Sequence, residues 1–583
     1  MRHENFPSRA MEVLGRVSDM EGLRMSQYLH PGVYVQEAPS AVKPIEGVSS
    51  STAAFVGFAD KGPVPGTILP SGRPAQPVLV TSFTEYTRTF GSFRTDSYLT
   101  YAVQSFFQNG GSNLYVIRVI PTPSSPPANN AAFATVVVGA GTGALNISAA
   151  NQGTWGNNTW VVVSPSSDGD PNNFKLQVMY GSTASQAVGN VVETYDNVTF
   201  SGSPSLLPGA ANPSSYARQV VNRASEYIAI TADFTARPAN TNVNLKAAPP
   251  VLPAQLAHGN DGLASAVNFL GAPATDSSVT GTGIFALDKI TDVSLIAIPG
   301  QGDAATVNAG IEYCKNTRPL QDCFFIGDMG TLSDVTQART DNGRPTVATI
   351  ADARTFATTG IGGQVDKSAG DYGAIYFPWI FAPDPIGQGR NPKILLPPSG
   401  FMAGIYARID NARGVFKAPA GTEAGVAGAL APYVTVSDVE QDQLNPILVN
   451  VIRSVPGSGL VVWGTRTIGS DASWRYIPVR RLAIFLRVSI YNGIQWAVFE
   501  PNDEPLWASL RLNVRAFMLT QFRAGAFQGS KPDDAFFVQC DSSTTTQQDV
   551  DNGVVNILVG FAPLKPAEFV VLKLSQKVNQ PAS

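Results

Sequence analysis

Residues 293–327 read VSLIAIPGQGDAATVNAGIEYCKNTRPLQDCFFIG and predict how the middle of the chain folds. Two short apolar runs, residues 293–298 and 323–327, have the length and composition of buried strands. Between them, residues 304–315 predict a helix. A strand, a helix and a second strand in succession are typical of a parallel α/β sheet. We therefore predict an α/β domain over residues 260–443.

The segments before this domain also combine strands with helices. Residues 99–109 predict a helix that ends at a glycine pair, and residues 114–120 predict a buried strand. We expect residues 26–120 to form an N-terminal arm and the first part of the core. Residues 1–25 then form an N-terminal extension.

Residues 121–259 differ in composition from both neighbours. They are rich in Ala, Asn, Ser, Thr, Gly and Pro, and their apolar runs, such as residues 159–163 and 174–179, are short. Short strands between turn-rich segments are typical of β-sheet domains. We predict an inserted all-β domain here, with exposed loops that can vary freely.

Residues 444–583 predict a C-terminal domain with two amphipathic helices. Their apolar side chains recur at helical spacing, as Val479, Leu482, Leu486 and Ile490 in the first helix and Leu506, Leu510, Val514, Phe517 and Met518 in the second. The second helix begins near Asp503, has Pro505 in its first turn and ends at Gly525. The chain as a whole is predicted to be an α+β multidomain protein. It would have an α/β core domain, a C-terminal α+β domain, the inserted all-β domain, and extended N- and C-terminal arms.

The two arms are extended segments without an obvious hairpin partner. In the first, HPGVYVQE at residues 30–37, Val33 and Val35 point one way and Tyr34 the other. In the second, the strand pattern is carried by Phe569, Val570, Val571, Leu572 and Leu574. Two interpretations fit these segments: edge strands of their own domain, or strands that add to neighbouring subunits.

Four arginines lie off the apolar stripes of the two predicted helices. Arg480 and Arg487 are seven residues apart on the first helix, and Arg511 and Arg515 are four apart on the second. Arg511 and Arg515 could simply form a solvated helix face.

The composition favours a subunit of a larger protein assembly. The chain has 583 residues, with 40 basic and 44 acidic side chains and a net charge of −4, so we expect no nucleic-acid partner. Only 14% of the residues are charged, against about 25% in typical soluble proteins. We therefore expect much of the surface to face other protein. No apolar run approaches the ~18 residues of a membrane span. Residues 1–24 lack the apolar region of a secretion signal, so we expect cytoplasmic assembly and no direct membrane insertion.

The sequence lacks the motifs of the common enzyme classes. It contains no GxxxxGK[ST] loop, no HExxH and no GxSxG. Only His3, His30 and His258 are available as bases for a catalytic triad. Cys314 and Cys323 have no nearby histidine and are expected to be buried thiols. We predict no enzyme activity, no catalytic residue, no metal and no cofactor.

A series of short motifs, in order along residues 30–570, resembles the contractile tail sheath proteins. This family includes the sheaths of phages, of R-type pyocin-like particles and of extracellular contractile injection systems. The motifs are residues 30–37 HPGVYVQE, 106–111 FFQNGG, 115–119 YVIRV, 153–158 GTWGNN, 376–379 YFPW, 397–400 PPSG, 417–421 KAPAG, 444–446 LNP, 462–467 VWGTRT, 498–502 VFEPN, 535–541 AFFVQCD and 565–570 KPAEFV. One departure is Arg487-Val488, where similar sheaths often have acidic residues after the double arginine. No charge pattern is therefore carried over to this helix.

The resemblance implies a structural role in a phage tail or tail-like injection particle. Subunits would polymerise as a helical stack of hexameric rings around an inner tube, and contraction would drive the tube into a target envelope. The implied partners are other copies of the chain, the tube protein, and baseplate and tail terminator or cap proteins. The arms would join neighbouring subunits, and Arg480, Arg487, Arg511 and Arg515 would be candidates to face the tube.

Two other functions compete with this interpretation. One is a different self-assembling coat, such as a surface-layer or capsid-like protein, which would form sheets or shells. The other is a hydrolase on the α/β domain, which would need a reactive nucleophile near His258.

Overall fold

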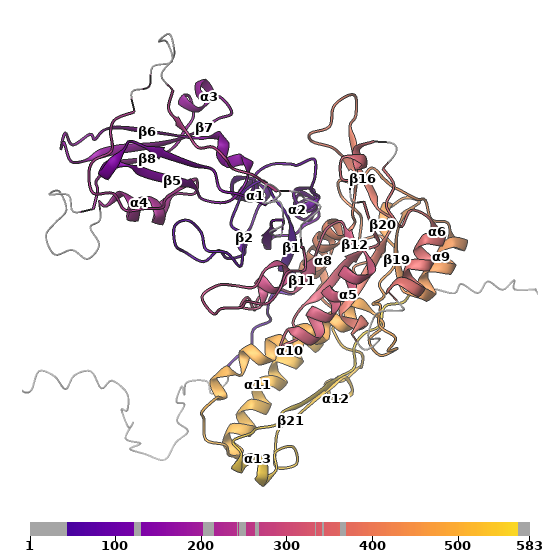
Figure 1. The fold of residues 1–583 in the computed structure, drawn as a ribbon. Helices are drawn as coiled ribbons and strands as arrows, with labels where there is room; N and C mark the ends of the chain where they lie inside the picture. The colour runs from indigo at the N-terminus through magenta and orange to yellow at the C-terminus, as the bar shows by residue number, and fades with distance from the viewer. Residues whose placement is uncertain are drawn as a thin grey trace, which may run out of the picture. The chain divides into compact units, whose positions relative to one another are not determined.

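The computed structural model describes residues 43–121, 130–201, 215–241, 243, 252–262, 268–332, 334–340, 343–361 and 369–569. At its centre is an eight-stranded sheet with the order β2-β3-β1-β11-β13-β15-β19-β20 (Figure 1). Its strands are β1 (Ala53–Phe58), β2 (Val78–Val80), β3 (Leu114–Val119), β11 (Leu295–Ala297), β13 (Phe324–Asp328), β15 (Gly373–Phe377), β19 (Val449–Val455) and β20 (Gly459–Val462).

The inner strands of this sheet, from β3 to β19, are parallel, and the edge strands β2 and β20 are antiparallel to their neighbours. The parallel pairing of β11 with β13 agrees with the strand–helix–strand pattern of residues 293–327. The sheet also includes β19 and β20, so it continues past residue 443, where we placed the end of the α/β domain.

Helices cover both faces of the sheet. They are α1 (Phe83–Phe90), α2 (Leu99–Gln108), α5 (Ala304–Glu312), α6 (Ile350–Thr355), α8 (Ser399–Arg413) and α9 (Asp438–Leu444). Adjacent residues of β13 point to opposite faces. Phe324 contacts Tyr406 of α8, with ring centroids 6.4 Å apart, and Phe325 packs against Gly310 of α5. The helix and the strand expected at residues 99–109 and 114–120 are confirmed as α2 and β3.

The close packing of α8 on α2 depends on small residues. A Cβ at Gly400 would lie 2.6 Å from the Cα of Ala102, and a Cβ at Gly404 would lie 2.4 Å from the carbonyl oxygen of Phe106. Any larger residue at either position would push the two helices apart.

The insertion folds around a second hydrophobic core and has two sheets. One sheet has the order β10-β6-β7-β8 and the other β4-β5-β9. The strands are β4 (Thr135–Val138), β5 (Leu145–Ala149), β6 (Thr159–Pro165), β7 (Phe174–Tyr180), β8 (Val191–Val198), β9 (Ile228–Ile230) and β10 (Ala254–Gln255). The expectation of an all-β insertion is wrong, because α3 (Ala184–Val188) and α4 (Ala217–Ala224) lie within it. These helices are one or two turns long, which is too short for a clear helical period.

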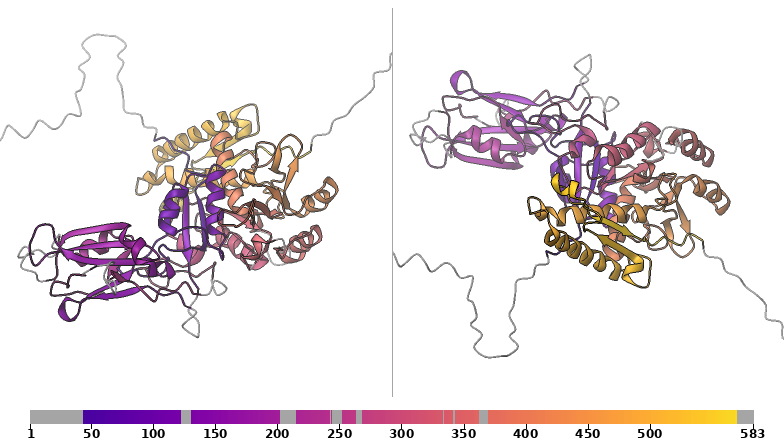
Figure 2. Two further views of the ribbon diagram at one scale, coloured as in Figure 1. Left: turned by 90° about the horizontal axis from the view of Figure 1, so that it is seen from above. Right: turned by 90° about the horizontal axis from the view of Figure 1, so that it is seen from below.

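Both helices predicted near the C-terminus are present, as α10 (Ile477–Gly493) and α11 (Glu504–Arg523). Figure 2 shows these two long orange-yellow helices side by side in both views. Phe485 of α10 and Phe517 of α11 are in contact, with ring centroids 6.1 Å apart. The side chain of Asp503 accepts a hydrogen bond from the backbone of Leu506 and caps the start of α11.

Short elements complete this part of the chain. They are β16 (Ile380–Pro383), β17 (Lys393–Leu396), β18 (Ala431–Pro432), β12 (Gln301–Gly302), β14 (Gly330–Thr331), α12 (Pro532–Ala535), β21 (Phe536–Gln539), α13 (Gln547–Asp551) and β22 (Leu558–Phe561). Strands β21 and β22 pair as an antiparallel two-stranded sheet. Phe527, four residues after the end of α11, packs against Phe536 of β21 and Phe561 of β22, with ring centroids 6.0 and 5.8 Å apart.

Candidate assembly surfaces

The first described residues of the chain pack against α10. The side chain of Ile45 is buried in a cluster with Leu482 and Leu486. Close to it, the backbone N–H of Val48 donates a hydrogen bond of 3.1 Å to the hydroxyl of Ser489. The segment that follows the N-terminal residues is therefore held by the same helix that packs on α11.

Arg481 of α10 completes this attachment. Its guanidinium binds both carboxylate oxygens of Asp410 on α8, at 3.0 and 2.5 Å, and donates to the carbonyl oxygen of Ser50 at 2.7 Å. Both side chains of the ion pair are 3% exposed. Breaking such a buried pair leaves an uncompensated charge. The pair thus fixes α10, α8 and the N-terminal segment to one another.

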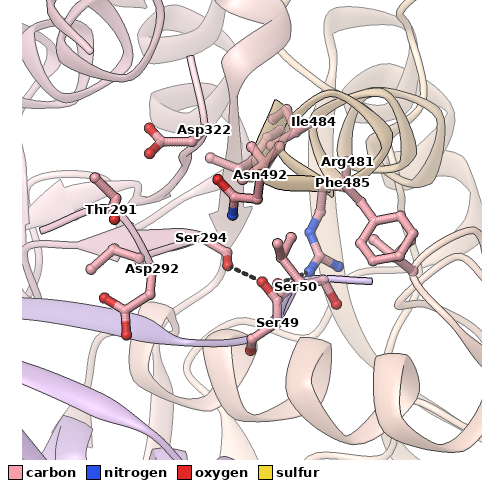
Figure 3. Close-up of a pocket in the computed structure, with 15 residues that line it drawn as sticks. Ser49, Ser50, Thr291, Asp292, Ser294, Asp322, Arg481, Ile484, Phe485 and Asn492 are labelled. Atoms are coloured by element: carbon pink, nitrogen blue, oxygen red, sulfur yellow. Dashed lines mark hydrogen bonds between the residues drawn. The ribbon is translucent and has the colours of Figure 1, made fainter. Parts of the chain in front are cut away.

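Beside Arg481 lies a cavity of about 110 Å³ (Figure 3). Its charged groups already have partners in the fold: Arg481 binds Asp410, Asp322 forms an ion pair with Arg318 at 2.6 Å, and Asp292 accepts a hydrogen bond from the hydroxyl of Tyr115 at 3.2 Å. The hydroxyl of Ser294 donates to the carbonyl oxygen of Ser49. No nucleophile with a neighbouring base lies among the residues that line this cavity. We interpret it as a packing space.

The last described residues lie along a groove of about 820 Å³. One wall is formed by residues 564–569 and the other includes Phe416, Lys417, Asp442 and Trp463. Glu568 attaches this segment to the rest of the subunit. Its carboxylate receives hydrogen bonds from Arg466 at 2.9 and 2.6 Å, and these bonds raise the pKa of Arg466.

Two of the four predicted tube-facing arginines are engaged inside the subunit. Arg480 is 5% exposed, forms an ion pair with Asp371 and stacks on Trp474, 3.8 Å from the ring centroid. Arg487 is half-buried and donates to Gln321 at 2.7 Å and to the hydroxyl of Tyr372 at 3.1 Å. In the isolated subunit the guanidinium of Arg480 is enclosed. A side chain that contacts the tube would have to lie at the surface. Arg480 does not, because α10 has buried residues on nearly every side.

The other two arginines lie at the surface of α11. The side chain of Arg511 is 35% exposed, donates to the carbonyl oxygen of Cys540 and lies 3.5 Å from Glu504. The side chain of Arg515 is 48% exposed and forms an ion pair with Asp533 at 2.8 Å. Both can reach a partner surface, although each already has an acidic neighbour.

Most of the predicted arm strands lie outside the described residues. This holds for Val33, Tyr34 and Val35 and for Val570, Val571, Leu572 and Leu574. Phe569 is described, is 74% exposed and belongs to no strand. Strand addition by either arm stays a prediction.

The features required for a hydrolase or a metal site do not come together in the described part of the chain. His258 is exposed at a positive φ of 70°, and no hydrogen bond joins it to a serine or cysteine there. Cys314, Cys323 and Cys540 are buried free thiols, and burial raises the pKa of Cys540 to about 11. No cluster of three or more His, Cys, Asp or Glu side chains with metal-binding geometry is found among the described residues. Nor does any described helix have the length and apolar character needed to cross a membrane.

The segments next to the two predicted arms, residues 45–50 and 564–569, are called the arm roots below. Sequence reasoning missed the side chains that hold them. Arg481 and Asp410 are 71 residues apart, and Arg466 and Glu568 are 102 apart. No periodic pattern connects such distant positions. One signal in the sequence could have pointed to Arg466 and Glu568: each lies in a motif of the sheath resemblance, VWGTRT or KPAEFV.

Two family models match the chain. The phage tail sheath protein central domain matches residues 278–468, and the phage tail sheath C-terminal domain matches residues 469–577. Together they span more than half of the chain. The border between them lies just after β20, which places the whole eight-stranded sheet before residue 469.

Individual relatives agree with these models. A tail sheath protein of Vibrio phage KVP40 is 27% identical over 180 residues, which is 30% of this chain and 26% of the relative. A putative prophage major tail sheath protein of Pseudomonas aeruginosa is 25% identical over 174 residues, which is 30% of this chain and 44% of the relative. The matched parts are thus less than half of each relative.

Solved structures match over nearly the whole chain. The helical sheath of the anti-feeding prophage in its contracted state is 20% identical, covers 94% of this chain and 99% of its own, and has a TM-score of 0.51. The sheath complex of the extracellular contractile injection system PVC, also contracted, is 21% identical, covers 94% and 98%, and has a TM-score of 0.50. A sheath tail protein of Listeria innocua is 11% identical, covers 89% and 96%, and has a TM-score of 0.52. These similarities show the fold.

Proposed function

Because this chain belongs to the phage tail sheath protein family, we propose that it is the structural subunit of a contractile sheath. In this proposal, copies of the chain form a helical stack of hexameric rings around an inner tube. The observation that carries the proposal is the match of the central and C-terminal sheath models over residues 278–577, in order and without a gap.

A helical stack requires contacts that propagate from one subunit to the next rather than close on themselves. The two arms are suited to such contacts, since each would add a strand to a neighbouring subunit. Both arm roots are held firmly: α10 packs on residues 45–50, and Arg466 binds Glu568. A fixed root favours transfer of force from a neighbour into the body of the subunit.

The tube-facing surface is proposed to include α11. Arg511 and Arg515 project from it at the surface and would contact an acidic tube. Arg480 and Arg487 bind Asp371 and Gln321 inside the subunit, and we assign them the role of holding α10 in place rather than contacting the tube.

The free energy that drives contraction comes from the packing of subunits in the sheath. Subunits assemble in an extended, metastable arrangement, and a signal from the baseplate releases them into a wider and shorter arrangement of lower free energy. The subunit–subunit contacts supply this free energy, so the mechanism requires neither a nucleotide nor a metal. The partners are the tube protein, baseplate proteins and a terminator or cap protein.

Negative-stain electron microscopy of the purified chain tests the proposal. We expect hollow cylinders with regular ridges. Flat sheets or closed shells would favour a different self-assembling coat. Monomers at every concentration would contradict the proposal, and the α/β domain and the adjoining His258 loop would then be tested for hydrolase activity with a His258→Ala control.

A further inference from the structure

Glu568 has contacts that its neighbours lack. The guanidinium of Arg466 donates to both of its carboxylate oxygens, and the hydroxyl of Tyr476 donates to one of them at 3.2 Å. The side chains of Arg466 and Glu568 are each 11% exposed. A bidentate Arg–carboxylate pair fixes direction as well as distance, because its two hydrogen bonds are parallel.

Arg466 is in turn held by the central sheet. Its backbone N–H donates to the side-chain oxygen of Asn450 on β19 at 2.7 Å, and its carbonyl oxygen accepts from the amide of the same asparagine at 2.8 Å. Asn450 is fully buried and also donates to the carbonyl oxygen of Ile375 on β15. A third contact joins the guanidinium of Arg466 to the carbonyl oxygen of Asn445. The path from Glu568 therefore leads into two strands of the eight-stranded sheet.

The residues around Glu568 have few other attachments. The backbone N–H of Leu564 lies 3.5 Å from the carbonyl oxygen of Ala526. Within the described part of the chain, residues 565–569 make no backbone–backbone hydrogen bond. Without the Arg466 pair, this segment would be released back to Leu564, close to the end of β22.

We infer that Glu568 is a positioning residue that fixes the root of the C-terminal arm to the central sheet through Arg466. The inference rests on the proposed function, in which a neighbouring subunit holds the arm. A pull on the arm then reaches β19 and β15 directly. The force is then not carried by the two-stranded sheet β21–β22, which precedes the root in the chain. That sheet is only four residue pairs long, and a pull along the chain would break its hydrogen bonds one at a time.

The root itself can be observed in the unassembled subunit. Ala567 is exposed and adjacent to Glu568, and the native cysteines are buried, so Ala567→Cys accepts a nitroxide label selectively. We expect an immobilised spectrum in the otherwise native chain. In Glu568→Gln and in Arg466→Gln we expect a mobile spectrum, because an amide cannot form the charged bidentate pair. Tyr476→Phe, which removes one hydrogen bond, should give an intermediate spectrum.

A matched control removes a different ion pair beside the same groove. Arg453 and Asp438 are 2.6 Å apart, and neither forms a hydrogen bond or ion pair with the described residues 564–569. Asp438→Asn should therefore leave the label immobilised. Equal mobility in Glu568→Gln and in the native chain would overturn the inference, as would a mobile label in Asp438→Asn. Circular dichroism of each variant reports whether the body of the subunit is folded.

The mechanical part is tested on assembled sheaths. We expect Glu568→Gln sheaths to fall apart at a lower urea concentration than native or Asp438→Asn sheaths. Identical midpoints would show that the pair carries no load and would overturn that part. If the native chain forms no sheath, the proposed function fails, but the nitroxide spectra still decide whether Glu568 fixes the root. The two failures are thus distinguishable.

Discussion

At the scale of single residues, Asp328 is the buried group with the clearest effect on stability. It lies at the carboxyl end of β13, is 2% exposed, and accepts hydrogen bonds from Gly300 and from the backbone and hydroxyl of Ser399. No basic side chain forms an ion pair with it among the described residues. Burial outweighs these hydrogen bonds and raises the pKa of Asp328 to about 6.

This pKa predicts a pH-dependent cost of folding. Because the carboxyl binds its proton more tightly in the folded chain, the ionised form destabilises the fold: stability is lost as the pH rises from the usual pKa of 3.8 to the folded pKa of about 6, and it stays level above that. Relative to Asp328→Asn, the native chain should lose about 2 kcal/mol of stability between about pH 4.5 and about pH 7.5. Urea midpoints of both proteins at the two pH values measure this difference. A difference that does not change with pH would contradict the prediction.

Phe499 is a second residue that lowers the stability of the fold, here through its backbone conformation. It is fully exposed and has a positive φ of 71°, a backbone conformation that an aromatic residue rarely adopts. Glycine adopts this conformation without strain, and no apolar contact is lost in the isolated subunit. We expect Phe499→Gly to be more stable than Phe499→Ala by about 1 kcal/mol. Thermal midpoints compare the two variants, and a more stable alanine variant would show that the loop is unstrained.

At the scale of elements, α11 and α10 divide the roles proposed for the C-terminal domain. Most of helix α10 is buried, and two of its arginines, Arg480 and Arg481, form ion pairs with Asp371 and Asp410. Helix α11 has a buried stripe and an exposed side with Arg511 and Arg515. In the proposed function, contact with the tube is therefore expected on α11.

We predict that Arg511→Glu combined with Arg515→Glu prevents extended assembly on the tube, because it reverses two charges that would face an acidic surface. Contracted sheath, which has left the tube, should still form. Arg523→Glu on the same helix is the control, since this exposed arginine lies in the last turn, away from both. Electron microscopy with and without tube protein distinguishes the two forms. Equal loss of both forms would argue against contact with the tube.

The same scale shows which elements could be predicted from the sequence. The stripes Leu482–Leu486 and Leu510–Val514 identified α10 and α11 because their apolar side chains repeat at helical spacing and are buried. Helices α3 and α4 were missed because one or two turns give no clear period. Arg466 and Glu568 were found as motif residues but not as partners, since contacts across 102 residues depend on the folded chain.

At the scale of the whole molecule, the arms should decide between a folded subunit and a sheath. Removing residues 570–583 leaves Glu568 and the body of the subunit in place. We expect this variant to have a native circular dichroism spectrum and to form no sheath, because it cannot reach a neighbour. Sheaths of native length from the shortened chain would contradict a role for the C-terminal arm.

In the proposed function one folded subunit forms two lattices, and cryo-electron microscopy of sheaths assembled on the tube can image both. Particles would be imaged before and after a mild denaturant triggers contraction. We predict a narrow lattice that becomes wider and shorter, with the eight-stranded sheet and the Arg466–Glu568 pair unchanged in both. A single lattice under both conditions, or a subunit that refolds between them, would show that the sheath does not contract in this way.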